Sequence, residues 1–66
     1  MFINEIDDET GARTTINIQH ICRLLDGGDK TLIWTLDGSI KWVRNSYDDV
    51  FKKICLYNEI KGIMKR

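Results

Sequence analysis

TLIWTLDGSIKWVR, at residues 31–44, is the stretch that decides the fold. Its two halves are rich in β-branched and aromatic residues, as strands are, and Asp37-Gly38 between them is a strong signal for a two-residue hairpin turn. Such a turn pairs Trp34 with Lys41, so one tryptophan is expected on each face of the hairpin. The expected faces are Leu32, Trp34, Leu36 and Val43 on one side and Ile33, Ile40 and Trp42 on the other. Either face could pack on a helix.

A helix is expected directly after the hairpin, in the region 46–65. Ser46 supplies a hydroxyl at the N-cap and Asp49 an acid three residues later, which is a variant of the capping box. No glycine or proline interrupts the chain before Gly62, so the helix should run from Tyr47 to at least Ile60. At 100° per residue its apolar side chains form two separate sectors. These sectors are Tyr47, Val50, Phe51, Ile54 and Tyr57, and Leu56, Ile60 and Ile63.

The residues before the hairpin predict further strands. Phe2–Ile6 and Thr14–Ile18 have the apolar, β-branched character of short strands, and the polar run Asp7–Gly11 between them ends in glycine, as turns do. The next stretch, Gln19–Leu25, fits either a helix or two strands around a bend. We favour a bend near Gln19-His20 and a strand from residue 21 to residue 25, followed by a turn over 26–29.

Together these elements predict an α+β fold. An antiparallel sheet of four to five strands, with an SH3-like or barrel-like curl, should occupy residues 1–45 and be followed by one C-terminal helix. The 66 residues are expected to form a single domain, 1–66. A chain of this length buries only about 60% of the surface that its unfolded form exposes, so its stability is marginal.

Composition excludes several classes of protein. The hydrophobic fraction of 42% argues against disorder, and no apolar run is long enough to cross a bilayer as a helix. No secretion signal is visible, so we expect a cytoplasmic location. Cys22 and Cys55 are expected to be free, since a small secreted scaffold would carry more cysteines.

The sequence offers no recognisable catalytic or metal-binding motif. His20 and Cys22 lie two residues apart and would share a face of a strand, but no oxyanion-hole motif accompanies them. Two ligands are also too few for a structural zinc site. Asp26, Asp29 and Asp37 have the positions of turn formers. We therefore expect no enzyme activity, no metal and no cofactor.

More apolar surface is present than one helix and one small sheet can hide. The helix can cover one face of the hairpin only, and the sector led by Leu56 needs a cover of its own. This predicts a homo-oligomer, with the self-closed small barrel as the alternative. The candidate interface residues are Trp34, Trp42, Leu56, Ile60 and Ile63.

Nucleic-acid binding is the second hypothesis. Trp34 and Trp42 could stack bases while Lys41 and Arg44 hold phosphates. The formal net charge of zero argues against it, because affinity for phosphate depends on a basic surface.

One pattern reaches from Ile16 to Val50, about half of the chain. Its residues are Ile16-Asn17, Ile21, Thr35-Leu36-Asp37-Gly38-Ser39, Val43 and Ser46-Tyr47-Asp48-Asp49-Val50. In this layout the chain resembles the flagellar and swarming-motility FlbD-like family of small bacterial and phage proteins. The resemblance implies a bacterial or phage origin, hence the cytoplasm of a bacterium or of an infected host cell, and it supplies no catalytic residues.

The sequence thus predicts a small non-enzymatic binding module. We expect a homo-oligomer that engages a protein or a small ligand, as a phage-encoded inhibitor or a ligand-sequestering protein would. The alternative is a small nucleic-acid-binding regulator.

Overall fold

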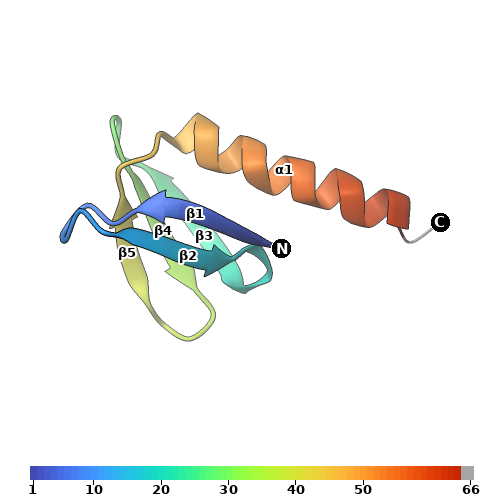
Figure 1. The fold of residues 1–66 in the computed structure, drawn as a ribbon, viewed down its shortest axis with the longest axis horizontal. Helices are drawn as coiled ribbons and strands as arrows, with labels where there is room; N and C mark the ends of the chain where they lie inside the picture. Colours follow the sequence, from blue (N-terminus) through green and yellow to red (C-terminus); the bar gives the residue numbers. More distant parts are fainter. Residues whose placement is uncertain (65–66) are drawn as a thin grey trace.

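The computed structural model describes residues 1–64 of the chain, with side chains through Ile60, and confirms the α+β fold (Figure 1). Five strands and a short 3-10 helix precede one long C-terminal helix. The bend expected at Gln19-His20 is the 3-10 helix, and the ambiguous stretch that follows it is a strand. The elements are β1 (Phe2–Ile6), β2 (Arg13–Asn17), η1 (Ile18–His20), β3 (Ile21–Asp26), β4 (Thr31–Thr35), β5 (Ile40–Val43) and α1 (Tyr47–Met64).

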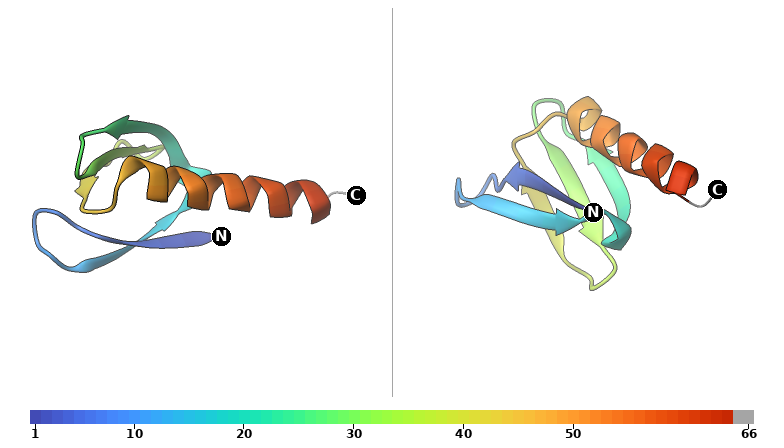
Figure 2. Two further views of the ribbon diagram at one scale, coloured as in Figure 1. Left: turned by 90° about the horizontal axis from the view of Figure 1, so that it is seen from above. Right: turned by 45° about the vertical axis from the view of Figure 1, so that its right-hand side comes forward.

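The strands form two antiparallel sheets, where a single sheet was expected. β1 pairs with β2, and β3, β4 and β5 form the second sheet in that order. A bridge between Asp7 and Val43 joins the sheets at one corner, where the Arg44 N–H donates to the Ile6 carbonyl at 2.8 Å. The two sheets face one another across the core (Figure 2). The predicted curl is therefore present as an incompletely closed, barrel-like sandwich.

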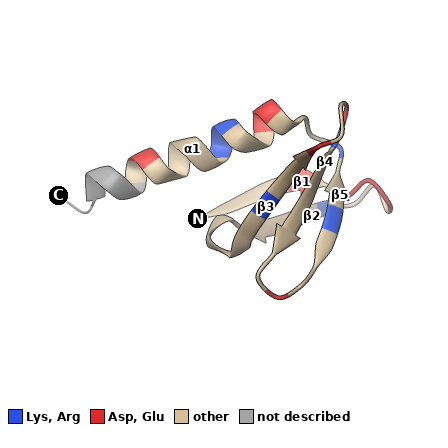
Figure 3. Cartoon of the chain, turned by 180° about the vertical axis from the view of Figure 1, so that it is seen from behind, with Lys and Arg blue, Asp and Glu red and all other residues tan. Residues whose placement is uncertain are grey.

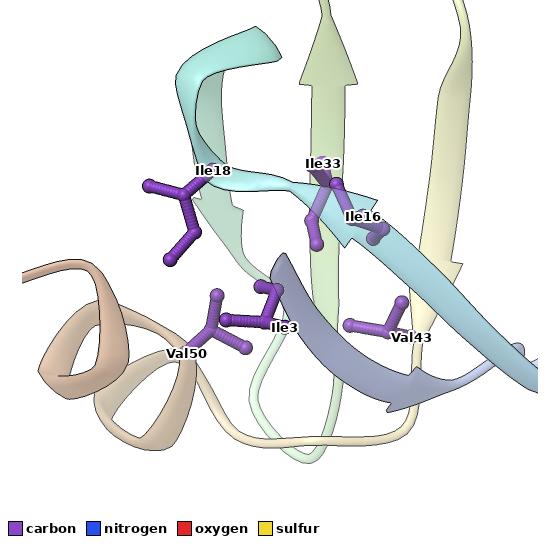
Figure 4. Close-up of a cluster of buried hydrophobic side chains, with 6 residues drawn as sticks. All are labelled: Ile3, Ile16, Ile18, Ile33, Val43 and Val50. Atoms are coloured by element: carbon purple, nitrogen blue, oxygen red, sulfur yellow. The ribbon is translucent and has the colours of Figure 1, made fainter. Parts of the chain in front are cut away.

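The core fills the space between the sheets and under the start of α1. Six buried aliphatic side chains come from both sheets, η1 and the helix, and they point toward one another (Figure 4). They are Ile3, Ile16, Ile18, Ile33, Val43 and Val50. Ile54 and Tyr57 pack against this cluster from the next turns of the helix. The first predicted helix sector therefore faces the core, although Phe51 is exposed and stacks on Tyr47 with ring centroids 5.8 Å apart.

Helix α1 closes one end of the space between the sheets, and its C-terminal half extends past them (Figures 1 and 2). Its start is the predicted one. The Asp49 N–H donates to the Ser46 hydroxyl at 3.2 Å, and the Val50 N–H donates to the Ser46 carbonyl at 3.1 Å. Ser46 is thus the N-cap, and it fixes where the helix leaves the sheet.

Replacing Ser46 with alanine should lower the free energy of unfolding by about 0.5–2 kcal/mol, because a helix N–H loses its acceptor. The urea midpoint measures the change. A midpoint equal to that of the wild type would contradict the capping role.

The predicted hairpin register is wrong by one residue. Thr31 pairs with Val43, Leu32 with Trp42, and Trp34 with Ile40. The loop therefore contains three residues, 36–38, and not two. Only the glycine in it has a positive φ, of 88°. The Gly38 N–H donates to the Thr35 carbonyl and the Thr35 N–H to the Ser39 carbonyl, both at 3.0 Å, as in a type I turn closed by a glycine bulge.

Gly38→Val should cost at least about 1 kcal/mol, because a β-branched residue is strained at positive φ. Gly38→Asn is the control and should cost less, since asparagine tolerates this region. Equal urea midpoints for the two variants would contradict the strained turn.

Candidate functional site

The one-residue shift in register brings both tryptophans to one surface. Residues that pair directly in a sheet share a face, so Trp34 lies with Arg23 and Ile40, and Trp42 lies with Leu32 and Leu25. We call this surface the outer face. Its members are Arg23, Leu25, Leu32, Trp34, Ile40 and Trp42. The expectation of one tryptophan on each face is wrong.

No described helix or strand lies over the outer face. Figure 3, which views the molecule from behind, shows β3, β4 and β5 in front of β1 and β2, with α1 to one side. The exposed fractions of Leu25 and Ile40 are 41% and 59%. The core instead lies on the opposite, inner face of the same sheet, with Ile33 and Val43. An uncovered face that carries large apolar side chains is typical of a binding surface.

The two indole rings are held in place by their neighbours. The Arg23 guanidinium lies 4.6 Å from the centroid of the Trp34 ring, and the Lys30 ammonium lies 4.8 Å from that of Trp42. Gly27 lies directly against Trp42, since a methyl group at Gly27 would come within 2.6 Å of a ring carbon. The turn between β3 and β4 therefore fixes Trp42 across the sheet, and the outer face is preorganised for contact.

The two predicted phosphate contacts, Lys41 and Arg44, are each paired with a carboxylate. Lys41 lies on the inner side of β5, where its ammonium contacts Asp7 at 3.0 Å, and this hydrogen bond is the main cause that lowers the pKa of Asp7. Arg44 pairs with Asp8 at 3.4 Å and donates to the Asp8 carbonyl at 3.2 Å. The acidic turn between β1 and β2 thus neutralises both cations.

The candidates on the helix lie on another surface. Leu56 and Ile60 are exposed, and Leu56 borders a shallow hollow beside Met1–Asn4, at the β1 side of the molecule. The structure therefore does not bring them to the outer face. The third candidate, Ile63, lies outside the residues whose side chains are described.

A cavity of about 200 Å³, lined mainly by polar residues, opens between β2 and the turn end of the β4–β5 hairpin, a feature that the sequence analysis missed. We call it the mouth cavity. It is lined by Thr14, Thr15, Ile16, Asn17, His20, Ile33, Thr35, Asp37, Ser39 and Lys41. The sequence contains a sign of this cavity, because the alternation of side chains along a strand places Thr14 on the same face as Ile16 and Thr35 on the same face as Ile33. The cavity could not be located from this pattern without knowing how the two sheets are arranged.

His20 and Cys22 do not share a face of one strand, as the sequence analysis supposed. His20 lies in η1, is exposed and borders the mouth cavity. Cys22 is exposed on β3, with its thiol 3.5 Å from the Trp34 carbonyl, and both Cys22 and Cys55 are free. Within residues 1–60 no three histidine, cysteine or acidic side chains are grouped to hold a metal ion.

A buried ion pair links β1 to α1. The carboxylate of Glu5 is fully buried, and its Oε1 contacts the ammonium of Lys53 at 2.9 Å, while Asp49 contacts the same ammonium at 3.2 Å. The other oxygen of Glu5 has no hydrogen-bond partner among the described atoms. Burial raises the pKa of Glu5 despite the lysine. Burial opposes the charge of Lys53, but hydrogen bonds to Glu5 and Asp49 outweigh it and raise the pKa of Lys53.

Comparison of the chain with protein-family models, with curated proteins and with solved structures finds no match. Within the described part of the chain, α1 is not apolar enough over its length to cross a membrane.

Proposed function

We propose that the chain is a non-enzymatic binding module that works as a homo-oligomer, with the outer face as the contact between subunits. The observation that carries this proposal is the presence of Trp34 and Trp42 on one uncovered face, together with three aliphatic side chains. The resemblance of residues 16–50 to the FlbD-like family supports a small bacterial or phage protein. The free thiols of Cys22 and Cys55 support a reducing compartment such as the cytoplasm.

The size of the chain favours a permanent partner for this face. The core contains six buried aliphatic side chains, and the outer face offers five further large apolar ones. Full burial of one such side chain stabilises by about 1.5–3 kcal/mol, which matters in a domain of marginal stability. A second copy of the chain is always available at matching concentration, and a two-fold dimer is the simplest closed assembly.

The arrangement of charge on the outer face agrees with a protein contact. Arg23 lies on the edge strand β3 and Lys30 in the turn beside it, so both cations are at one border of the outer face, whereas Leu32 and Trp34 lie on the central strand β4. Depletion of charge at the centre and a charged rim are typical of subunit interfaces.

A single-stranded nucleic acid is the second candidate for this face. Each tryptophan has a cation next to its ring, which is the combination that stacks bases and attracts phosphate. The absence of net charge and the pairing of Lys41 and Arg44 with carboxylates weaken this candidate.

The test is light scattering of the full chain at micromolar concentration, with Trp34→Glu and Leu56→Glu as matched variants. We expect a wild-type mass that is a multiple of 7.7 kDa, a monomer for Trp34→Glu, and an unchanged assembly for Leu56→Glu. A monomeric wild type would overturn the proposal. Dissociation by Leu56→Glu alone would move the contact to the helix, and co-purified material that absorbs at 260 nm and is lost in Trp34→Glu would favour nucleic acid.

A further inference from the structure

The space between the two sheets has two different ends. Helix α1 closes one of them with Val50 and Ile54, and the mouth cavity opens at the other. Beside the buried isoleucines the cavity is lined by polar side chains. On β2 the inward position next to that of Ile16 is occupied by Thr14, and on β4 the one next to that of Ile33 by Thr35. The cavity therefore has an apolar floor and polar walls, as small-ligand sites have.

We propose that the mouth cavity binds a small neutral polyol, and that the group recognised is the vicinal diol of a ribose-like ring. This inference goes beyond the subunit contact and does not depend on it, because the cavity lies on the inner side of the sheet that carries the outer face.

The size of the cavity fits a single sugar ring. Its volume of about 200 Å³ is below the range of about 300–1,000 Å³ that is usual for drug-sized ligands. It corresponds to the liquid volume of about seven water molecules, at about 30 Å³ each. A pentose fits this space, and the base of a nucleoside would extend through the open side.

The walls offer both donors and acceptors to such a ring. Within the described part of the chain, the Thr14 hydroxyl and the ring nitrogens of His20 have no hydrogen-bond partner. Asn17 accepts from the Gln19 N–H at 3.0 Å through its oxygen, which leaves its NH2 group to donate. A sugar hydroxyl both donates and accepts, so this mixture suits it.

Asp37 supplies the acceptor for the diol. Its Oδ1 is fixed by the Ser39 N–H at 3.0 Å and by the Thr35 hydroxyl at 2.5 Å. Hydrogen bonds from Thr35 and Ser39 lower the pKa of Asp37 to about 2, so the carboxylate is ionised at any working pH. A carboxylate that accepts from ribose hydroxyls is a recurrent solution in nucleotide-binding folds.

The charges at the cavity disfavour a phosphate. The ammonium of Lys41, which is one of the lining residues, is paired with Asp7, and Asp37 contributes a negative charge to the wall. The described lining therefore has no unpaired cation, and a neutral ligand meets less repulsion than an anion does.

The experiment is a titration of the 15N-labelled full chain followed by NMR, with D-ribose, adenosine and inorganic phosphate as probes. We expect ribose and adenosine to shift the amide signals of residues 14–20 and 35–41, and phosphate to leave them unchanged. Asp37→Asn keeps a good turn former, and Thr14→Val keeps the shape of the side chain. Each should weaken binding at least tenfold. Asp26→Asn is the matched control, because Asp26 also accepts an N–H two residues on, from Gly28 at 2.9 Å, but lies outside the cavity.

Any of the following results in the wild type would overturn the inference: no shifts at millimolar probe, shifts confined to residues of the outer face, or stronger binding of phosphate at the same residues. Unchanged affinity in Thr14→Val would do so as well, and this variant decides the matter if the spectrum of Asp37→Asn shows that it has lost the native fold. The mass of the same samples by light scattering separates the two proposals, since a wild-type chain that forms an oligomer but binds neither ribose nor adenosine contradicts the cavity inference alone.

Discussion

Replacing Lys53 with methionine is expected to lower the free energy of unfolding by about 2–4 kcal/mol at pH 7. The substitution leaves the carboxylate of Glu5 buried without its counter-ion, next to the like charge of Asp49. Removing one partner of a fully buried pair costs about 3–5 kcal/mol. Here the cost is smaller, because 37% of the Lys53 side chain is exposed and water screens the pair from that side. Urea denaturation measures the change.

The penalty should shrink as the pH falls. Burial raises the pKa of Glu5 above its ordinary value of 4.5, so the folded protein holds this proton more tightly than the unfolded chain does. The stabilisation linked to a raised pKa is complete below 4.5 and is lost as the pH rises through the folded value. Without Lys53 the folded value rises further, so the deficit of the variant relative to the wild type should be smaller at pH 4 than at pH 7.

Two controls separate the lost ion pair from other effects of the substitution. Lys52→Met removes a neighbouring exposed lysine of the same helix and should leave the urea midpoint nearly unchanged. Adding Glu5→Gln to Lys53→Met removes the unpaired charge and should recover much of the loss. A penalty that is the same at both pH values would show that Lys53 acts through packing and not through its charge.

Elements with a local signal could be predicted from the sequence. The helix start at Ser46 depends on a hydroxyl and two acids within one turn, and the strand at Phe2–Ile6 on its own apolar pattern, so both agree with the structure. The separation of Leu56 and Ile60 from the helix sector that faces the core also followed from their helical angle alone. These features need no information from distant parts of the chain.

The outer face could not be predicted, because its residues depend on the length of one turn. Asp37-Gly38 suits both a two-residue turn and a three-residue turn closed by a glycine bulge. The second is stabilised by hydrogen bonds from Thr35 and Ser39 to the Asp37 carboxylate. The difference of one residue transfers a whole strand to the other face of the sheet, since side chains alternate.

The mouth cavity and the buried Glu5 were missed for a different reason. Both depend on the division into two sheets, which is set by the pairing of Asp7 with Val43, 36 residues apart by their numbers. Glu5 lies two residues after Ile3 and so shares its inward face of β1. In a strand pattern, however, a charged residue normally indicates the solvent-exposed face. The burial of the Glu5 carboxylate is explained only by the position of α1, which brings the ammonium of Lys53 next to it.

Ile33→Ala is expected to lower the free energy of unfolding by about 2–5 kcal/mol. At low protein concentration, Ile40→Ala is expected to lower it by only a small fraction of this amount. The side chain of Ile33 is 1% exposed and lies in the core, so its removal leaves a cavity, whereas Ile40 is 59% exposed on the outer face. A two-residue turn would have put these isoleucines on the same face with similar costs. The pair therefore tests the register directly through two urea midpoints.

Protein concentration supplies the second half of this test. If the outer face is a subunit contact, the deficit of Ile40→Ala should grow as the concentration is raised to where the wild type associates, because assembly then adds to the stability of the wild type. The deficit of Ile33→Ala arises within one subunit and should stay largely constant. Equal losses for the two variants at every concentration would contradict both the three-residue turn and the separation of the core from the outer face.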